Sequence, residues 1–392
     1  MKKTLLAAAL MVGFAGVAQA ETSVTLYGVV DGGIGYQRVK GNDENGDSAK
    51  ATRTGLLSGV QRGNRWGLRG TEDLGDGLRF IFQLESGFNI ADGNSAQGGR
   101  LFGREAHFGL AGDNWGQLTF GRQTTVSSLY MPGIASPFGG SFMQANAGAT
   151  FSAINTTRYD NMIQYQTPSY AGFQLGVGYS FNTNGAQYGT LKRADGSKIK
   201  PDQQAWSTAL RYANGPIAVG LSYDQNRSAR NSWDDDEKVK DWGGSNKRVT
   251  AKEWTLAASY DFEVVKLHLA GGQSRDGLIT PESYYGIGGK VVDVGLNDGL
   301  FNKGFRANNY TVGLSAPVGA GKVMASWGMS DLRKTANGDK SDYKNQQIYS
   351  LGYTYPLSKR TNVYAIGSYA KNVYYAPKLK STLVGVGLSH QF

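Results

Sequence analysis

The 392-residue chain contains no cysteine, so no disulfide bond can hold it together. Beyond its first 20 residues it also lacks any segment that approaches the roughly 20 apolar residues of a membrane-spanning helix. Its stability must therefore come from extensive strand pairing or packing. The composition favours strands, because 22 Tyr, 16 Phe and 56 Gly stand against only nine Pro.

Histidine is also scarce, with only His107, His268 and His390 in the whole chain. A hydrolase needs a nucleophile positioned by a base, and neither His268 nor His390 lies beside a Ser-x-Gly or carboxylate constellation. The histidines also lack the spacing of metal ligands. The sequence therefore predicts no enzyme, no catalytic residue, no cofactor and no metal site. Basic residues are dispersed along the chain, which argues against nucleic acid as a partner.

Charge is missing from one long segment. Gln123–Thr157 holds 35 residues without Lys, Arg, Asp, Glu or His, in a chain of which 18% is charged, and Arg122 and Arg158 flank it. Two prolines and four glycines exclude a membrane helix, and no strict alternation indicates a strand. The segment reads as a long loop, and loops of this length are usually functional or disordered.

The N-terminus has the three parts of a secretory signal peptide. Lys2 and Lys3 are followed by an apolar stretch, Leu5–Ala18, and by the cleavage site Ala18-Gln19-Ala20. We expect residues 1–20 to be removed, which lowers the formal charge from +10 to +8 through the loss of the two lysines. Residues 21–392 are then expected to form one domain.

The C-terminus reads as a strand. Positions counted back by two from Phe392 reach His390, Leu388, Val386 and Val384, while the alternate positions are mostly small or polar. This period of two predicts a terminal strand with one apolar face. A terminal aromatic on such a strand resembles the signal that the bacterial barrel assembly machinery reads, and we assign that role to Phe392.

Turn-like clusters divide the chain at regular intervals. Seven short connections are expected at residues 71–77, 112–116, 168–172, 213–216, 261–264, 316–321 and 356–360. Eight long ones are expected near residues 39–55, 90–100, 123–157, 183–203, 227–250, 275–305, 332–345 and 372–379. Their strict alternation joins sixteen antiparallel strands and predicts an all-β transmembrane barrel, with short periplasmic turns and long external loops. The expected location is the outer membrane.

Local alternation gives each strand a charged face. Arg65 and Arg69 share one parity while Trp66 and Leu68 share the other, and Gln83 and Glu85 oppose the apolar residues of their own strand. Farther along, Arg158, Asp160 and Gln164 are expected to oppose Tyr159, Ile163 and Tyr165. A charged inner face predicts a water-filled channel.

The chain resembles the general porins of Gram-negative β-proteobacteria, of the Bordetella and Neisseria type. The resemblance covers the mature chain and rests on VTLYGVVDGGIGY, NRWGLRGTEDLGDGLRFIFQLESGFN, LFGREAHFGL, FGRQ, TTRYDNMIQYQTPSYAGFQLGVGYSF and the final Phe392. It implies a sixteen-stranded barrel, a homotrimer, and a third external loop, about residues 123–157, that folds into the lumen. It also implies outer-membrane lipid and lipopolysaccharide as surroundings.

The resemblance further implies an arginine cluster on the wall that faces this loop. By motif, the expected constriction residues are Arg65, Arg104, Arg158 and Glu85, joined by Arg69, Arg122 and Asp160. Arg104 shares parity with Phe108, and Arg122 with Phe120, so a place in the lumen requires a bulge or a break in alternation. The alternative is that either arginine pairs with backbone or carboxylates at a rim.

The lack of charge in the infolded loop indicates whether the channel prefers anions or cations. Enterobacterial general porins carry a PEFGG-like turn in this loop, whereas here Ser136–Gly140 reads SPFGG and lacks the acid. Unopposed arginines favour anions, so we expect a general diffusion pore for small anionic and neutral solutes. Alternatives are a substrate-specific channel, for phosphate or another small anion, and a plugged structural or adhesin barrel.

Overall fold

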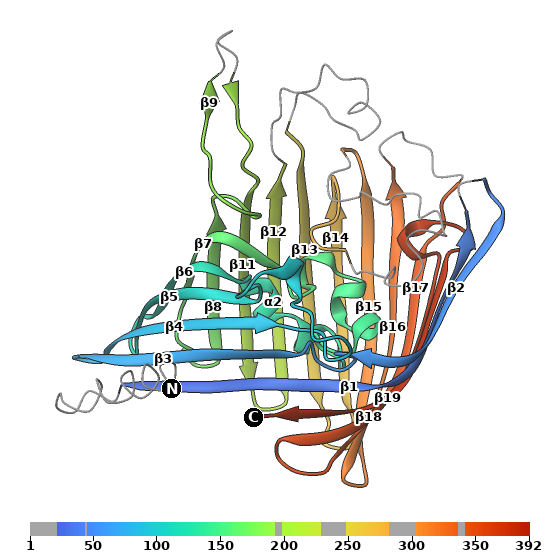
Figure 1. The fold of residues 1–392 in the computed structure, drawn as a ribbon, viewed down its shortest axis with the longest axis horizontal. Helices are drawn as coiled ribbons and strands as arrows, with labels where there is room; N and C mark the ends of the chain where they lie inside the picture. Colours follow the sequence, from blue (N-terminus) through green and yellow to red (C-terminus); the bar gives the residue numbers. More distant parts are fainter. Residues whose placement is uncertain (1–21, 44, 193–197, 229–247, 282–302, 336–341) are drawn as a thin grey trace, which may run out of the picture.

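The computed structural model describes residues 22–43, 45–192, 198–228, 248–281, 303–335 and 342–392. The expected signal peptide lies outside these residues. The described chain is a closed antiparallel β-barrel (Figure 1). Within the same ranges, no helix has the length and the apolar character needed to cross a membrane.

Seventeen strand segments form the barrel sheet. Their bounds are β1 Ser23–Asn42, β2 Ser48–Ser58, β3 Arg65–Gly75, β4 Leu78–Gly87, β5 Glu105–Gly112, β6 Gly116–Thr124, β7 Arg158–Gln166, β8 Phe173–Ser180, β11 Gln204–Asn214, β12 Ile217–Arg227, β13 Thr250–Asp261, β14 Lys266–Arg275, β15 Arg306–Val318, β16 Gly321–Lys334, β17 Gln346–Pro356, β18 Thr361–Lys371 and β19 Lys380–Gln391. A separate two-stranded ribbon pairs β9 Leu191–Lys192 with β10 Lys198–Ile199.

The segments β2 and β3 are two parts of one barrel strand. Both pair with β1, β2 along Gly32–Asn42 and β3 along Ser23–Val29. The strand is interrupted at residues 59–64, so the seventeen segments make sixteen strands, which confirms the predicted number. The ring closes where β1 pairs with β19 and where β8 pairs with β11.

All seven short connections fall where the sequence predicts them. The first long connection is different from the prediction, because β1 and β2 pair through most of residues 39–55 and leave only residues 43–47 between them. Strand pairing here overrides the polar composition from which a loop was inferred. Parts of the fourth, fifth, sixth and seventh long connections, and residue 44 of the first, lie outside the described residues.

The third long connection folds into the barrel. It comprises residues 125–157, here called the inner loop, and contains α2 Val126–Tyr130, α3 Pro132–Ala135, and the short turns η2 Met143–Ala145, η3 Ala147–Ala149 and η4 Ser152–Ile154. Helix α2 packs on β11, α3 packs on β13 and β14, and η2 packs on β17 and β18. Figure 1 places α2 within the ring of strands. The inner loop therefore runs along most of one side of the inner wall.

Small residues on the wall make room for the inner loop. On five strands, a Cβ added to an inward glycine would lie 2.9 Å or less from an atom of this loop, at Gly176, Gly220, Gly313, Gly328 and Gly352. Apolar loop side chains such as Met131, Phe151 and Ile154 are fully buried in return. Burial of this kind supplies the free energy that holds an uncharged loop against the wall.

Replacing one of these glycines is expected to displace the inner loop. A Cβ at residue 313 would lie 2.4 Å from Pro137 Cδ, so Gly313→Val should push the loop toward the lumen and reduce single-channel conductance. Gly367→Val is the matched control, because nothing lies within 4 Å of the added Cβ. Equal conductance of the two variants in planar bilayers would contradict the close fit.

Candidate functional site

Hydrogen bonds fix the inner loop to the far wall. Glu253 on β13 accepts hydrogen bonds from Ser152 Oγ at 2.7 Å and from the Ala153 N–H at 2.9 Å. The Gln144 amide donates to Ser368 Oγ on β18 at 3.1 Å. Glu253 is 1% exposed, so it holds the loop and presents no charge to the channel. The loop is held at both its middle and its end.

A first charged group surrounds Glu85 on β4, on the wall opposite the strands that the inner loop contacts. Glu85 Oε1 lies 2.5 Å from Arg104 Nε, and Glu85 Oε2 lies 3.7 Å from Arg65 Nε. The Tyr27 hydroxyl donates to Glu85 Oε2 at 2.9 Å, and the Arg69 guanidinium stands 5.4 Å from the centre of the Tyr27 ring. One carboxylate thus holds two arginines, and a tyrosine beside it supports a third.

A second charged group surrounds Glu105 on β5. Its Oε1 lies 3.5 Å from Arg158 Nε, and its Oε2 lies 3.4 Å from His107 Nδ1. The Thr124 hydroxyl donates to Glu105 Oε1 at 2.5 Å. Glu85 and Glu105 are register partners, so the two groups are adjacent on one face of the sheet.

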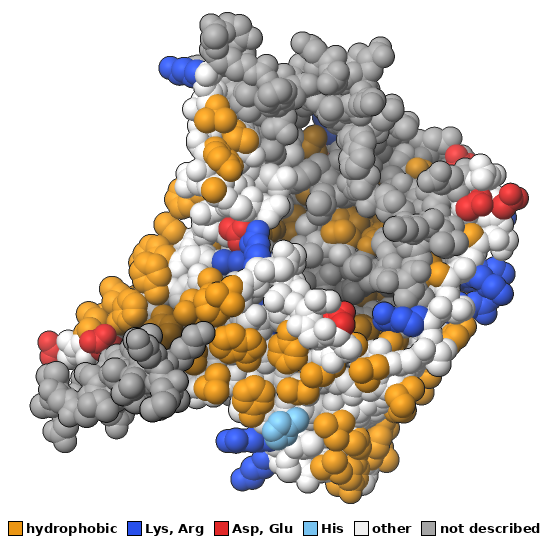
Figure 2. All heavy atoms as spheres, viewed as in Figure 1, with side chains coloured by type: hydrophobic (Ala, Val, Ile, Leu, Met, Phe, Trp, Pro, Cys, Tyr) orange, Lys and Arg blue, Asp and Glu red, His pale blue; other side chains and the backbone are white. Residues whose placement is uncertain are grey.

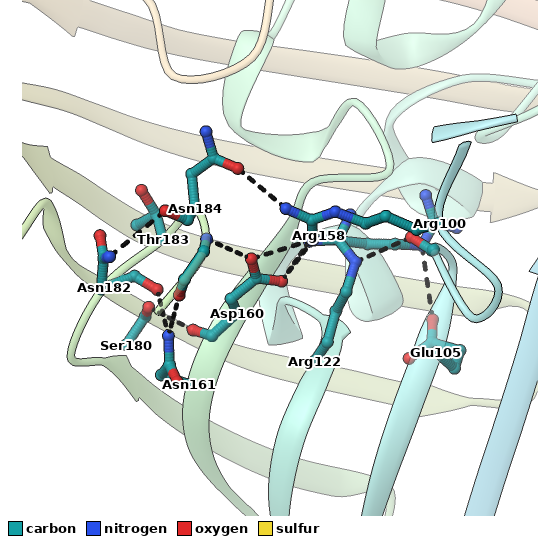
Figure 3. Close-up of polar contacts among 12 residues, drawn as sticks. Arg100, Glu105, Arg122, Arg158, Asp160, Asn161, Ser180, Asn182, Thr183 and Asn184 are labelled. Atoms are coloured by element: carbon teal, nitrogen blue, oxygen red, sulfur yellow. Dashed lines mark hydrogen bonds and ion pairs between the residues drawn. The ribbon is translucent and has the colours of Figure 1, made fainter. Parts of the chain in front are cut away.

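A third charged group surrounds Asp160 on β7, as Figure 3 shows. Asp160 Oδ1 lies 2.6 Å from Arg122 Nη1 and 2.8 Å from Arg100 Nη1. Asp160 Oδ2 accepts from the Gly185 N–H, and Arg100 donates to the Asn184 side chain at 2.9 Å. This group links the connection before β5 to the connection after β8.

Strand alternation separates Arg122 from the arginines of the other two groups. Arg122 shares parity with Phe120, which packs on Phe108 at a ring distance of 5.9 Å, and Phe108 is 53% exposed on the outer surface. The register of β6 and β7 shifts between Gly121 and Gln123, where Asn161 has a φ of +47°. The Arg122 side chain therefore leaves β6 on the outer face and reaches Asp160 where the regular alternation ends.

A family model described as Gram-negative porin matches residues 7–373 of the chain. The chain belongs to the Gram-negative porin family. It is 51% identical over 404 residues to an outer membrane porin protein of Bordetella pertussis, with both chains fully covered. It is 32% identical over 384 residues to outer membrane porin protein 32 of Delftia acidovorans, which spans 95% of this chain and 90% of that one.

Solved structures agree with this assignment. This porin resembles the anion-selective porin from Comamonas acidovorans with a TM-score of 0.67 and 27% sequence identity, over 95% of this chain and all of that one. The protein is thus a general porin of the outer membrane. Members of the family are non-enzymatic channels and are typically trimers.

The structure of this porin brings together four of the residues named from the sequence. Arg65, Arg104, Glu85 and Arg158 lie in the first two groups, and Arg69 stands beside the first. Arg104 needs no bulge, because it precedes β5 and its N–H donates to the Glu85 carbonyl. Arg122 and Asp160 stand apart, in the third group.

The sequence-based prediction omits two polar partners, Glu105 and Arg100, and places one side chain on the wrong face. Glu105 directly follows Arg104 and shares the parity of His107, so inward alternation could have identified it, whereas Arg100 in a loop has no periodic signal. The expected parity of β7 is wrong at Tyr159. This side chain is 5% exposed and packs with Met162 on the inner side, because the bulge adds one residue.

Removal of the shared carboxylate is expected to destabilise the porin. Glu85→Gln leaves Arg65 and Arg104 without their counter-charge and should lower the free energy of unfolding by about 1–3 kcal/mol. Urea unfolding of the detergent-refolded barrel measures this change. The control Glu72→Gln removes the same charge from an exposed position of β3 and should leave the midpoint unchanged. Equal midpoints for the two variants would show that Glu85 does not organise the arginines.

Proposed function

We propose that this porin is a diffusion channel with a preference for anions, in which the inner loop and the first two charged groups form the constriction. The supporting observation is the imbalance of charge on one wall. The wall carries two carboxylates, Glu85 and Glu105, beside four arginines, Arg65, Arg69, Arg104 and Arg158. Four positive and two negative charges leave a formal charge of +2. The opposing inner loop carries no charge at all.

The geometry lets this charge act on ions in the channel. At physiological ionic strength the screening length is about 8 Å, so fixed charges on the wall remain effective across a narrow pore. Low-dielectric walls focus the field further. The anion-selective porin from Comamonas acidovorans, which has the same fold, supports the same sign.

The third charged group takes a different part in this proposal. Arg122 and Asp160 join Arg100 at the rim and tie two external connections together, as Figure 3 shows. Their formal charge is +1, and we assign it to the rim and not to the constriction. In the assembled protein we assign three copies of the chain to a homotrimer, surrounded by outer-membrane lipid and lipopolysaccharide. Small anionic and neutral solutes are its cargo.

Reversal of one wall charge tests the selectivity. Arg65→Glu changes the formal charge of the constriction from +2 to 0, so the ratio of anion to cation permeability should fall about fivefold or more. The reversal potential in a KCl gradient across a planar bilayer measures this ratio. Arg79→Glu, at an exposed position paired with Asp113, is the control. Cation preference of the unmodified protein, or an unchanged potential in Arg65→Glu, would refute the proposal.

The terminal residue is proposed to direct barrel assembly. Phe392 exchanges two backbone hydrogen bonds of 3.1 Å with Gly28, while its side chain remains 43% exposed. Phe392→Ala keeps the backbone bonds and removes the aromatic ring. We expect less protein in the outer membrane of cells but normal conductance after refolding in detergent. A loss of conductance in the refolded variant would indicate a structural role instead.

A further inference from the structure

A second basic region lies at the end of the barrel where the short turns meet. A pocket of 440 Å³ opens there, between the turn that joins β15 to β16, the turn that joins β17 to β18, and the interruption between β2 and β3. Phe138 and Phe142 of the inner loop line its inner end. In outer-membrane barrels the short turns face the periplasm. The pocket therefore lies at the periplasmic end of the barrel, directly below the inner loop.

The charged residues that line this pocket all have the same sign. They are Arg62, Lys322, Lys359 and Arg360, and none of the described lining residues is acidic. Lys322 points inward, because Met324 two positions along β16 is buried against the inner loop. The register Lys266↔Ser315↔Met324 brings one more lysine to the same part of the inner wall.

The pocket continues the basic wall of the constriction. Arg62 lies three residues before Arg65 and is close enough to repel it. The Arg62 N–H donates to the buried carboxylate of Asp31 at 3.2 Å, which fixes the backbone at this interruption. An anion that passes Arg65 thus meets Arg62 and then the lysines.

Several cations around a pocket whose described lining includes no acid match the chemistry of one particular class of ligand. A monovalent ion such as chloride offers one charge, whereas a phosphate or a polycarboxylate offers several oxygens that guanidinium and ammonium groups bind together. We propose that this pocket is a second anion-binding site, which holds polyvalent oxyanions at the periplasmic exit. This inference rests on the proposed anion preference and adds a second binding site beyond the constriction.

The test uses inorganic pyrophosphate as a blocker of KCl current through single channels. Lys322→Cys removes one lining charge and, because the chain has no cysteine of its own, creates one labelling site. We expect the half-blocking concentration to rise about fivefold. Aminoethyl methanethiosulfonate, which restores a positive charge at this position, should bring the native value back. The sulfonatoethyl reagent, which adds a negative charge, should weaken the block further.

Arg79→Cys serves as the matched control, since it removes one positive charge at an exposed site away from the pocket. An equal pyrophosphate block in Lys322→Cys and in the unmodified protein would overturn the second site. A pyrophosphate block that weakens in Arg65→Glu but not in Lys322→Cys would also overturn it. The reversal potential of the unmodified protein is measured in the same experiment. Cation preference there refutes the proposed function, whereas anion preference with an unaltered block refutes only this inference.

Discussion

The closure of the sheet is the constraint on which the rest of the structure depends. In hydrocarbon every backbone N–H and C=O needs a partner, and a sheet meets this requirement only when its edges are joined. Here β1 and β19 pair through twelve residue positions, and β1 pairs on its other side with β2 and β3. Closure forces successive side chains to alternate between lipid and lumen. The apolar residues on the surface in Figure 2 are one result, and the charged inner wall is the other.

The inner loop is stabilised by its lack of charge. A charged loop packed on the wall would have to desolvate its ions, which is costly without partners. Instead, apolar side chains fill the spaces left by wall glycines, and neutral polar side chains and backbone N–H groups of the loop form hydrogen bonds with the wall. Glu253 shows this division most clearly, because a fully buried carboxylate binds Ser152 and Ala153 and has no place in the channel. At the level of the inner loop, charge that acts on ions is thereby confined to the opposite wall.

Much of the fold could be predicted because turns and alternation are local signals. The seven short connections and the sixteen strands follow from residue types near one another in the chain. The infolding of the third loop was expected only from the resemblance to known porins. Two features could not be predicted from the sequence, because they depend on how one strand pairs with another. The polar start of β2 becomes strand only through its register with β1, and the bulge at Asn161 reverses the face of Tyr159. Glu105 and Arg100 were missed because an acidic partner is recognised only once the arginine that it binds has been placed.

The two acidic residues of the constriction explain how several arginines can share one small wall. Without Glu85, Arg65 and Arg104 would repel each other and move apart, so their positions and the field that they create would be poorly defined. Glu85 and Glu105 fix the guanidinium groups but cancel only part of their charge. The selectivity of such a pore is therefore set by the net positive charge that the carboxylates leave, held at defined positions, and not by the number of arginines. The same reasoning separates the Asp160 group, whose arginines are fixed by one carboxylate at the rim and contribute to the structure of the external connections.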